Sequence, residues 1–242
     1  MNILNLGCGT KISANPEVVN VDWSVYLLLR KYRILHLLAS PFLRGARRER
    51  YKSLAGNIKV HNHIKGIPYP ENSIDVVYHS HFFEHFDQGM AKRFQMEVRK
   101  VLKQGGIQRI VIPNFESLVQ AYIDHLSICK NKSDEWKVHD NYIAGILEQS
   151  VRKEAFGTSQ QPPFRRFVEN LILGDARRRG ETHQWMYDQF NLAALLEEVG
   201  FKEFALLTYN TSNIPNWNTY GLDYDESGSE YHPGSLYAEV RK

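Results

Sequence analysis

The sequence predicts an α/β fold in which a mainly parallel, seven-stranded sheet is covered by helices and carries a helical insertion. Two observations predict it. Short apolar runs typical of strands alternate with crossover-length segments through the first half of the chain. The strand pattern is lost between residues 114 and 182, where helical pieces alternate with polar breaks, and it returns in two runs near the carboxyl end. Since parallel strands need crossovers, the first half is expected to form the body of the sheet.

The predicted strands follow one another along the chain as apolar runs bounded by turn-forming or polar residues. The first five are residues 2–6, 18–21, 58–61, 74–78 and 107–112. The last two are residues 204–209 and 236–240, and we expect them to be inserted antiparallel.

Two helices are well marked by apolar residues at helical spacing. The first covers residues 90–102, and we expect it to stop at Gly105-Gly106 because glycine commonly follows a helix end. The second covers residues 188–199, between an aspartate that can cap its start and a glycine that ends it.

The whole chain, residues 1–242, is predicted to be a single domain with two insertions. Residues 24–57 form a basic helical insertion after the second strand. Residues 114–182 form a helical cap or lid, and residues 183–242 supply the carboxyl-terminal helix and the last two strands.

Composition excludes several classes of protein. The chain is 43% hydrophobic and 24% charged, which is typical of a globular protein and argues against disorder. The net charge of +3 does not favour a nucleic-acid partner bound along the whole surface. The two cysteines, Cys8 and Cys129, form no CxxC pair, so no metal site is predicted. No apolar run follows a basic amino-terminal stretch, and the expected location is the cytoplasm.

One segment, residues 24–52, is strongly basic. It holds eight Lys or Arg residues against Glu49 alone, a net charge of +7, and its apolar residues recur at helical spacing. Such a segment is compatible with a peripheral contact to a membrane or a glycolipid. It is also typical of a helix that docks on the core with its basic side in water, and we prefer this second interpretation.

The turn after the first strand carries the first chemical signal. Gly7 and Gly9 let the backbone approach a ligand closely and offer N–H groups to it, at the carboxyl end of a predicted parallel strand. Asp22 ends the next strand, where a carboxylate can accept two ribose hydroxyl hydrogen bonds. A dinucleotide site would require a third glycine where Ile12 stands. The pattern therefore indicates a ligand that contains a nucleoside but no pyrophosphate.

Several segments, taken in order, resemble the motifs of class I S-adenosylmethionine-dependent methyltransferases of the type-11-like group. They are LNLGCG (residues 4–9), VNVD (19–22), IPYPENSIDVVY (67–78), SHFFEH (80–85) and VLKQGG (101–106). The resemblance implies a Rossmann-like fold, S-adenosylmethionine as the cofactor and methyl transfer as the activity. One departure is that the family's helix between its first two strands is replaced here by a short loop.

The resemblance also implies a cofactor site. The residues implied to bind S-adenosylmethionine are Gly7, Cys8, Gly9, Asp22, Trp23, Asn62 and Ser80. The glycine turn would pass beneath the methionine part, and Asp22 would hold the ribose. Trp23 would pack near the adenine, and Asn62 stands where the family usually has an aspartate facing the adenine amino group. Ser80 would line the pocket where the methyl group is transferred.

Two late segments are similar to a subgroup associated with polysaccharide biosynthesis: HQWMY (residues 183–187) and YHPGSLY (231–237). This similarity implies that a saccharide or another small molecule is methylated, on oxygen. An oxygen nucleophile benefits from a general base. The candidates are His81, His85 and His183, with Tyr187 as the residue that orients the base, although each of these residues can equally have a purely structural role.

Two alternatives remain. His81, Glu84 and His85 match the H-x-x-E-H pattern of inverted zinc peptidases, in which the two histidines bind zinc and the glutamate is the base. That pattern requires a helix, whereas here the pentad directly follows a predicted strand. The other alternative is a non-catalytic protein that binds S-adenosylmethionine or acts as a scaffold.

Overall fold

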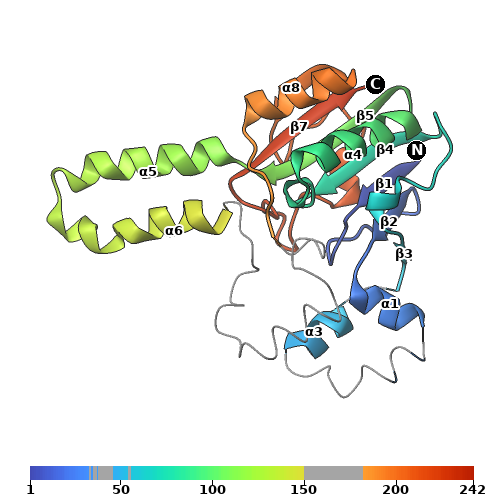
Figure 1. Ribbon diagram of the computed structural model, residues 1–242, viewed down its shortest axis with the longest axis horizontal. Helices are drawn as coiled ribbons and strands as arrows, with labels where there is room; N and C mark the ends of the chain where they lie inside the picture. The colour runs from blue at the N-terminus through green and yellow to red at the C-terminus, as the bar shows by residue number, and fades with distance from the viewer. Residues whose placement is uncertain (33, 35–36, 38–45, 54–55, 150–181) are drawn as a thin grey trace.

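The computed structural model places the strands in one seven-stranded sheet of order β3-β2-β1-β4-β5-β7-β6 (Figure 1). The strands are β1 (Ile3–Leu6), β2 (Val18–Asp22), β3 (Ile58–Val60), β4 (Ile74–Ser80), β5 (Leu102–Pro113), β6 (Lys202–Leu207) and β7 (Ser235–Arg241). Neighbouring strands are parallel except where β7 pairs antiparallel with both β5 and β6. The mainly parallel, seven-stranded sheet confirms the predicted fold class. The expectation that both of the last two strands are inserted antiparallel is wrong for β6, because among the described strands β7 alone is reversed. The structure describes residues 1–32, 34, 37, 46–53, 56–149 and 182–242.

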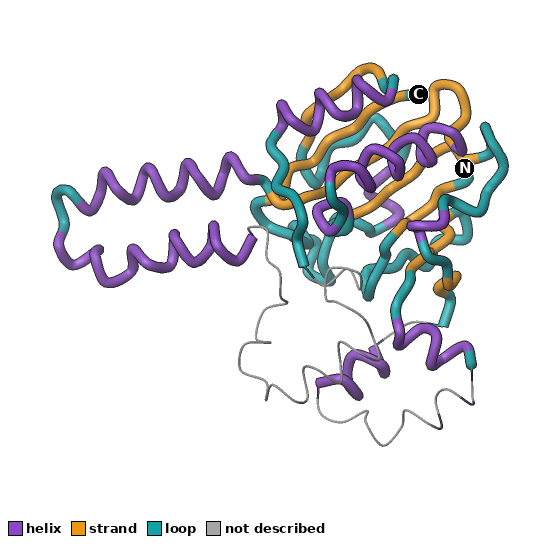
Figure 2. Tube along the Cα trace, viewed as in Figure 1, coloured by secondary structure: helices purple, strands orange, loops and turns teal. Residues whose placement is uncertain are grey.

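Two helices, α4 (Gln88–Val101) and α8 (Gln189–Val199), cover one face of the sheet (Figure 2). They bury apolar stripes that include Val98 and Leu196 against this face. The predicted capping of α8 is confirmed: the Asp188 side chain accepts hydrogen bonds from the backbone N–H groups of the first turn of the helix. The stop predicted at the Gly105-Gly106 pair is wrong, because α4 ends at Val101 and both glycines lie within β5.

The other face is covered by an irregular segment. A short loop joins β1 and β2, so no helix between them covers this face. The residues packed here come instead from positions 214–222, which include the 3₁₀ helix η6 (Trp217–Tyr220). The loop between the strands is fixed by a buried amide pair, in which Asn5 Nδ2 donates to Asn20 Oδ1 at 3.0 Å and to the Lys11 carbonyl at 2.9 Å. Amide hydrogen bonds thus stabilise the connection that the family makes with a helix.

A buried arginine holds the irregular segment to the sheet. Arg109 on β5 is fully buried, and its guanidinium donates to Asp223 at 2.8 Å and to Glu239 on β7 at 2.7 Å. Two further N–H groups donate to the carbonyls of Thr208 and Thr211, each at 3.0 Å. Because every charge in this group has a partner, the network tolerates burial that would otherwise be costly.

A pair of antiparallel helices projects from the sheet beyond the end of β5 (Figure 1). They are α5 (Phe115–Cys129) and α6 (His139–Gln149), joined through the 3₁₀ helix η4 (Ser133–Val138). These helices belong to the predicted cap of residues 114–182, of which residues 150–181 lie outside the described residues.

The basic segment begins with α1 (Val25–Lys31), which the Ser24 side chain caps, and continues in α3 (Ala46–Ser53). In α1 the side chain of Leu27 is buried while Arg30 and Lys31 are exposed, which fits the docked interpretation over the part that the structure describes. None of the described helices combines the length and the apolar character that crossing a membrane requires.

We expect Arg109→Met to lower the free energy of unfolding by about 3–5 kcal/mol, because it leaves two buried carboxylates without a compensating positive charge. Lys92→Ala, which removes an exposed ion pair with Glu198, is the control and should cost less than about 1 kcal/mol. Urea unfolding followed by tryptophan fluorescence measures both. A loss for Arg109→Met no larger than that of the control would contradict the proposed role of the network.

Candidate functional site

The glycine turn after β1 lies directly against the end of β2. The backbone N–H groups of Gly7 and Cys8 donate to the Val21 carbonyl at 2.9 and 3.3 Å. Burial raises the pKa of the Cys8 thiol, and the nearby negative charge of Asp22 raises it further. The turn and the acid are therefore neighbours, as predicted. The expectation that the Gly7 N–H is free for a ligand is wrong, because the neighbouring strand uses it.

The two glycines of this turn are required for different reasons. Both have positive φ angles, +64° at Gly7 and +53° at Gly9. A Cβ atom at Gly7 would lie 2.3 Å from the ring of Phe82, whereas a Cβ atom at Gly9 would meet nothing within 4 Å. Gly7 thus permits close packing beneath the turn, and Gly9 leaves open space beside the backbone.

The ends of β2 and β3 form the adjacent part of the site. One Asp22 carboxylate oxygen accepts the Trp23 backbone N–H at 2.7 Å, and the Trp23 side chain is 45% exposed. The Asp22 carbonyl accepts from the backbone N–H of His61 at 3.0 Å, and Asn62 follows at once. The three residues implied to bind the nucleoside (Asp22, Trp23, Asn62) are therefore placed at one edge of the sheet.

A second group of side chains gathers at the end of β4, next to Ser80. His81 has a φ angle of +47°, a strained conformation for a residue that is not glycine. Its Nε2 lies 2.8 Å from the Ser235 hydroxyl, which itself donates to the His232 carbonyl. The hydroxyl therefore accepts from His81 Nε2–H, and the neutral imidazole keeps its lone pair on Nδ1.

Glu84 lies beneath the histidines and is buried. Its Oε1 is 3.6 Å from His81 Nδ1 and 4.0 Å from His183 Nε2. Among the described residues, neither of its carboxylate oxygens has a hydrogen-bond partner. Burial raises the pKa of Glu84 to about 8, so that a large fraction of this carboxyl is protonated at neutral pH.

His81 and His85 are neutral at pH 7. Burial, assisted by the neighbouring histidines, lowers the pKa of His81 to about 3 and that of His85 to about 4. His85 Nδ1 donates to the Thr182 carbonyl at 3.2 Å, and its ring packs edge-to-face on His183. Such neutral imidazoles can accept a proton once a negative charge develops beside them.

Tyr187 and Trp185 follow His183 on the same segment but differ in exposure. Tyr187 is buried and stacks on Phe83, with ring centroids 5.0 Å apart, and the charge of Glu84 is among the causes that raise its pKa after burial. The Trp185 backbone N–H donates to the Glu84 carbonyl at 3.3 Å while its side chain remains 37% exposed. Trp185 therefore offers an aromatic surface beside the histidines.

The two groups are connected by Phe82 and by the loop that follows the glycine turn. Phe82 follows His81 directly in the chain, and its ring packs against Gly7, so this residue contacts the glycine turn from the histidine side. Lys11 lies over the ring of Tyr231, at 4.5 Å from its centroid, and Tyr231 precedes His232, whose ring is 4.0 Å from that of His81.

Three residues of this site were not assigned a role in methyl transfer from the sequence: Glu84, His232 and Ser235. Glu84 was considered only as the base of the zinc alternative, although its place one turn from His81 was a usable signal. His232 and Ser235 lie in the YHPGSLY segment, and only the fold brings that segment to β4.

The zinc-peptidase alternative requires both histidines of the pentad on one α-helix. His81 instead follows β4 directly, and the next residues form the 3₁₀ helix η3 (Phe83–His85). In this part of the described structure, the ligand atoms that lie within 4.8 Å of one another are those of Glu84, His85 and His183, a group that does not include His81.

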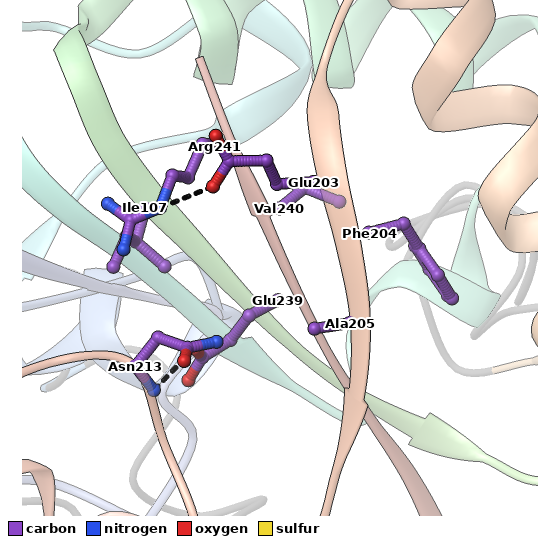
Figure 3. Close-up of a pocket in the computed structure, with 8 residues that line it drawn as sticks. All are labelled: Ile107, Glu203, Phe204, Ala205, Asn213, Glu239, Val240 and Arg241. Atoms are coloured by element: carbon purple, nitrogen blue, oxygen red, sulfur yellow. Dashed lines mark hydrogen bonds and ion pairs between the residues drawn. The ribbon is translucent and has the colours of Figure 1, made fainter.

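Figure 3 shows a separate cavity of about 270 Å³ beside β6 and β7. Its lining residues are Ile107, Glu203, Phe204, Ala205, Asn213, Glu239, Val240 and Arg241. None of the predicted site residues lines it, and the ion pair between Arg241 and Glu203 closes one side. We therefore do not assign the nucleoside ligand to this cavity.

Comparison with known proteins agrees with the geometry. Residues 4–110 match the family described as "Methyltransferase domain". No curated protein matches the chain.

Solved structures share little sequence with it. A "possible exported protein" from Bordetella parapertussis has 14% identity and a TM-score of 0.41, and the match covers 100% of this chain but only 61% of that protein. A SAM-dependent methyltransferase from Archaeoglobus fulgidus has 14% identity and a TM-score of 0.43, with 100% of this chain and 86% of the other covered. One from Methanosarcina mazei has 15% identity and a TM-score of 0.41, with 99% and 90% covered.

The glycine turn yields a paired prediction. Gly7→Ala combines a positive φ angle with a Cβ atom 2.3 Å from a side-chain ring, whereas Gly9→Ala carries only the backbone strain. We expect Gly7→Ala to destabilise the protein by at least about 3 kcal/mol and Gly9→Ala by about 1 kcal/mol. Thermal unfolding of both variants tests the difference, and equal losses would show that Phe82 does not fix the turn.

Proposed function

We propose that this chain is an S-adenosylmethionine-dependent methyltransferase and that it methylates an oxygen of a saccharide or another small molecule. The proposal is supported by the match of residues 4–110 to the family described as "Methyltransferase domain". The cofactor is S-adenosylmethionine, which supplies an activated methyl group when bound. The observation that carries the proposal is the buried Glu84 beside two histidines, at the end of the strand next to the glycine turn.

The residues at the glycine turn fit the cofactor. Gly9 leaves open space beside the backbone, where a ligand can approach closely. The Asp22 carboxylate ends the adjoining strand and is suited to the two ribose hydroxyls, and the half-exposed Trp23 offers a flat apolar surface to a base. Asn62 provides a carbonyl oxygen for an amino group. Cys8 and Ser80 complete the set as small residues at the ends of neighbouring strands.

The acceptor side combines a proton-handling group with an exposed aromatic ring. Trp185 is tied to Glu84 through its backbone, while its ring remains available to pack on the apolar face of a sugar. Tyr187 is buried and stacks on Phe83, so it supports this segment rather than contacting an acceptor. The role predicted for it, orienting the base, stays a prediction.

We assign His81 as the general base that removes the proton of the acceptor hydroxyl. Ser235 fixes the ring with its lone pair on Nδ1, on the side that faces Glu84. As the imidazole takes up the proton, ionised Glu84 stabilises the positive charge at close range. His183 faces the same carboxylate, and His85 packs on His183. We therefore assign these two residues the role of lining the polar side of the site.

The wider organisation of the protein is part of the same proposal. We propose one methyltransferase domain, located in the cytoplasm, with residues 24–57 and 114–182 as insertions that contribute to the choice of acceptor. The support is the charge of +7 over residues 24–52, whose described side chains include exposed Arg48 and Lys52 on α3. A glycolipid or membrane-bound acceptor with anionic groups would meet this surface.

For the cofactor, we expect Asp22→Ala to weaken the binding of S-adenosylmethionine about 30-fold, because hydrogen bonds to a charged group contribute about 2 kcal/mol. Isothermal titration measures the affinity. Asp124→Ala, which removes an exposed carboxylate on α5, is the matched control and should leave the affinity unchanged. An Asp22→Ala variant that is folded and binds as tightly as the wild type would show that the ribose lies elsewhere.

For catalysis, we expect His81→Gln to bind the cofactor normally but to transfer methyl groups about 100-fold more slowly. Transfer is followed with methyl-tritiated cofactor and a panel of nucleotide sugars and glycolipid extracts. In the wild type the rate should rise with pH as Glu84, with its pKa of about 8, ionises. Glu84→Gln should be slow and should lose this rise.

The outcomes separate the alternatives. A wild type that binds S-adenosylmethionine but labels no saccharide would favour the non-catalytic function. Full activity of His81→Gln would remove His81 as the base, and an unchanged pH profile of Glu84→Gln would reduce Glu84 to a structural role.

A further inference from the structure

We propose that His125, Cys129 and His139 bind a zinc ion at the outer end of the helical pair formed by α5 and α6 (Figure 1). His125 and Cys129 are four residues apart on α5 and so lie on one face of that helix. His139 opens α6, after the turn through η4. The ligand atoms of the three side chains lie within 4.8 Å of one another.

The distances fit a tetrahedral ion. Zinc bonds of about 2.3 Å to sulfur and about 2.0–2.1 Å to nitrogen place two nitrogens about 3.3 Å apart and sulfur about 3.6 Å from nitrogen. The Nδ1 atoms of His125 and His139 are 2.9 Å apart. Cys129 Sγ lies 3.5 Å from His125 Nδ1 and 3.9 Å from His139 Nδ1. All three separations can reach ideal values through movements of about half an ångström.

The surrounding residues orient these side chains as metal ligands are commonly oriented. The second nitrogen of His125, Nε2, lies 3.5 Å from a carboxylate oxygen of Glu135, the kind of neighbour that metal-binding histidines commonly have. Trp136 donates from its indole to the Cys129 carbonyl at 2.8 Å, which holds the end of α5. The Tyr142 ring stacks on His125 at 4.1 Å and shields the site from one side.

The packing of the helical pair gives a physical reason for a metal. In α5, which the structure describes throughout, the buried residue is His125, and η4 has none. Several large apolar side chains of the pair are exposed instead, including Ile128 and Trp136. A projecting pair with so small an apolar centre gains little from burial, and a metal cross-link is the usual compensation.

Zinc suits this ligand set because one thiolate and two imidazoles match its preference for sulfur and nitrogen. Binding deprotonates the Cys129 thiol and releases that proton to solvent, and water takes the fourth position. The proposal does not depend on methyl transfer. It departs from the prediction of no metal site, which rested on the missing CxxC pair and overlooked the His-x-x-x-Cys spacing on one helix.

The test measures metal content in the full-length protein, expressed with zinc and dialysed against metal-free buffer. We expect about one zinc per chain in the wild type and less than about one-tenth in Cys129→Ser and in His139→Gln. His183→Gln is the matched control, because it changes a member of the other cluster of possible ligands (Glu84, His85 and His183). This variant should retain about one zinc. Circular dichroism confirms that each variant is folded.

Cobalt provides a second readout on the unmodified chain. Cobalt-substituted wild type should show the thiolate-to-metal absorption of a tetrahedral site, and Cys129→Ser should lack it. Wild type without zinc would overturn the proposal and leave a direct N–H···N hydrogen bond between His125 and His139. Zinc that is lost in His183→Gln but kept in Cys129→Ser would overturn it as well.

Discussion

The buried ion pairs of Arg109 are the interaction on which the rest of the structure depends. The guanidinium binds carboxylates from β7 and from the segment after β6, and Asp223 also accepts from Tyr78 on β4 at 2.8 Å. One group of charges thus connects three strands with the irregular cover of the sheet. The same polypeptide segment continues to His232 and Ser235, which fix the His81 ring. The Tyr231 backbone N–H donates to the Asp223 carbonyl at 2.9 Å, so the network also holds the start of the segment that carries His232 and Ser235.

The site itself joins two chemical environments along the ends of adjacent strands. Beside β1 and β2 the backbone is close-packed at Gly7 and open at Gly9, which suits a ligand that lies flat against main chain. Beside β4 the side chains are polar, buried and neutral, because burial lowers the pKa of the histidines and raises that of Glu84. These opposing shifts keep charge out of the site until a reaction creates it.

The fold was predictable because its signals are local. The strands and the cap at Asp188 follow from apolar spacing and capping chemistry, and the glycine turn follows from residue types that only a tight bend requires. The end of α4 was misplaced because the diglycine looks like a helix stop but lies in a strand. Glu84, Ser235 and the cluster around Cys129 were missed for another reason. Their roles depend on contacts between residues that are distant in sequence or lie on successive helical turns. A short sequence motif does not reveal such contacts.

The antiparallel β7 and the cover at residues 214–222 also constrain how the chain acquires its fold during synthesis. The amino-terminal strands are made first, yet the side chains that shield one of their faces, such as Trp217, are made much later. Until then Ile3 and Val76 present an apolar surface to solvent or to chaperones. Contacts of such long sequence separation also slow folding. A chain that stops before residue 214 therefore leaves this face of the sheet exposed and prone to aggregation.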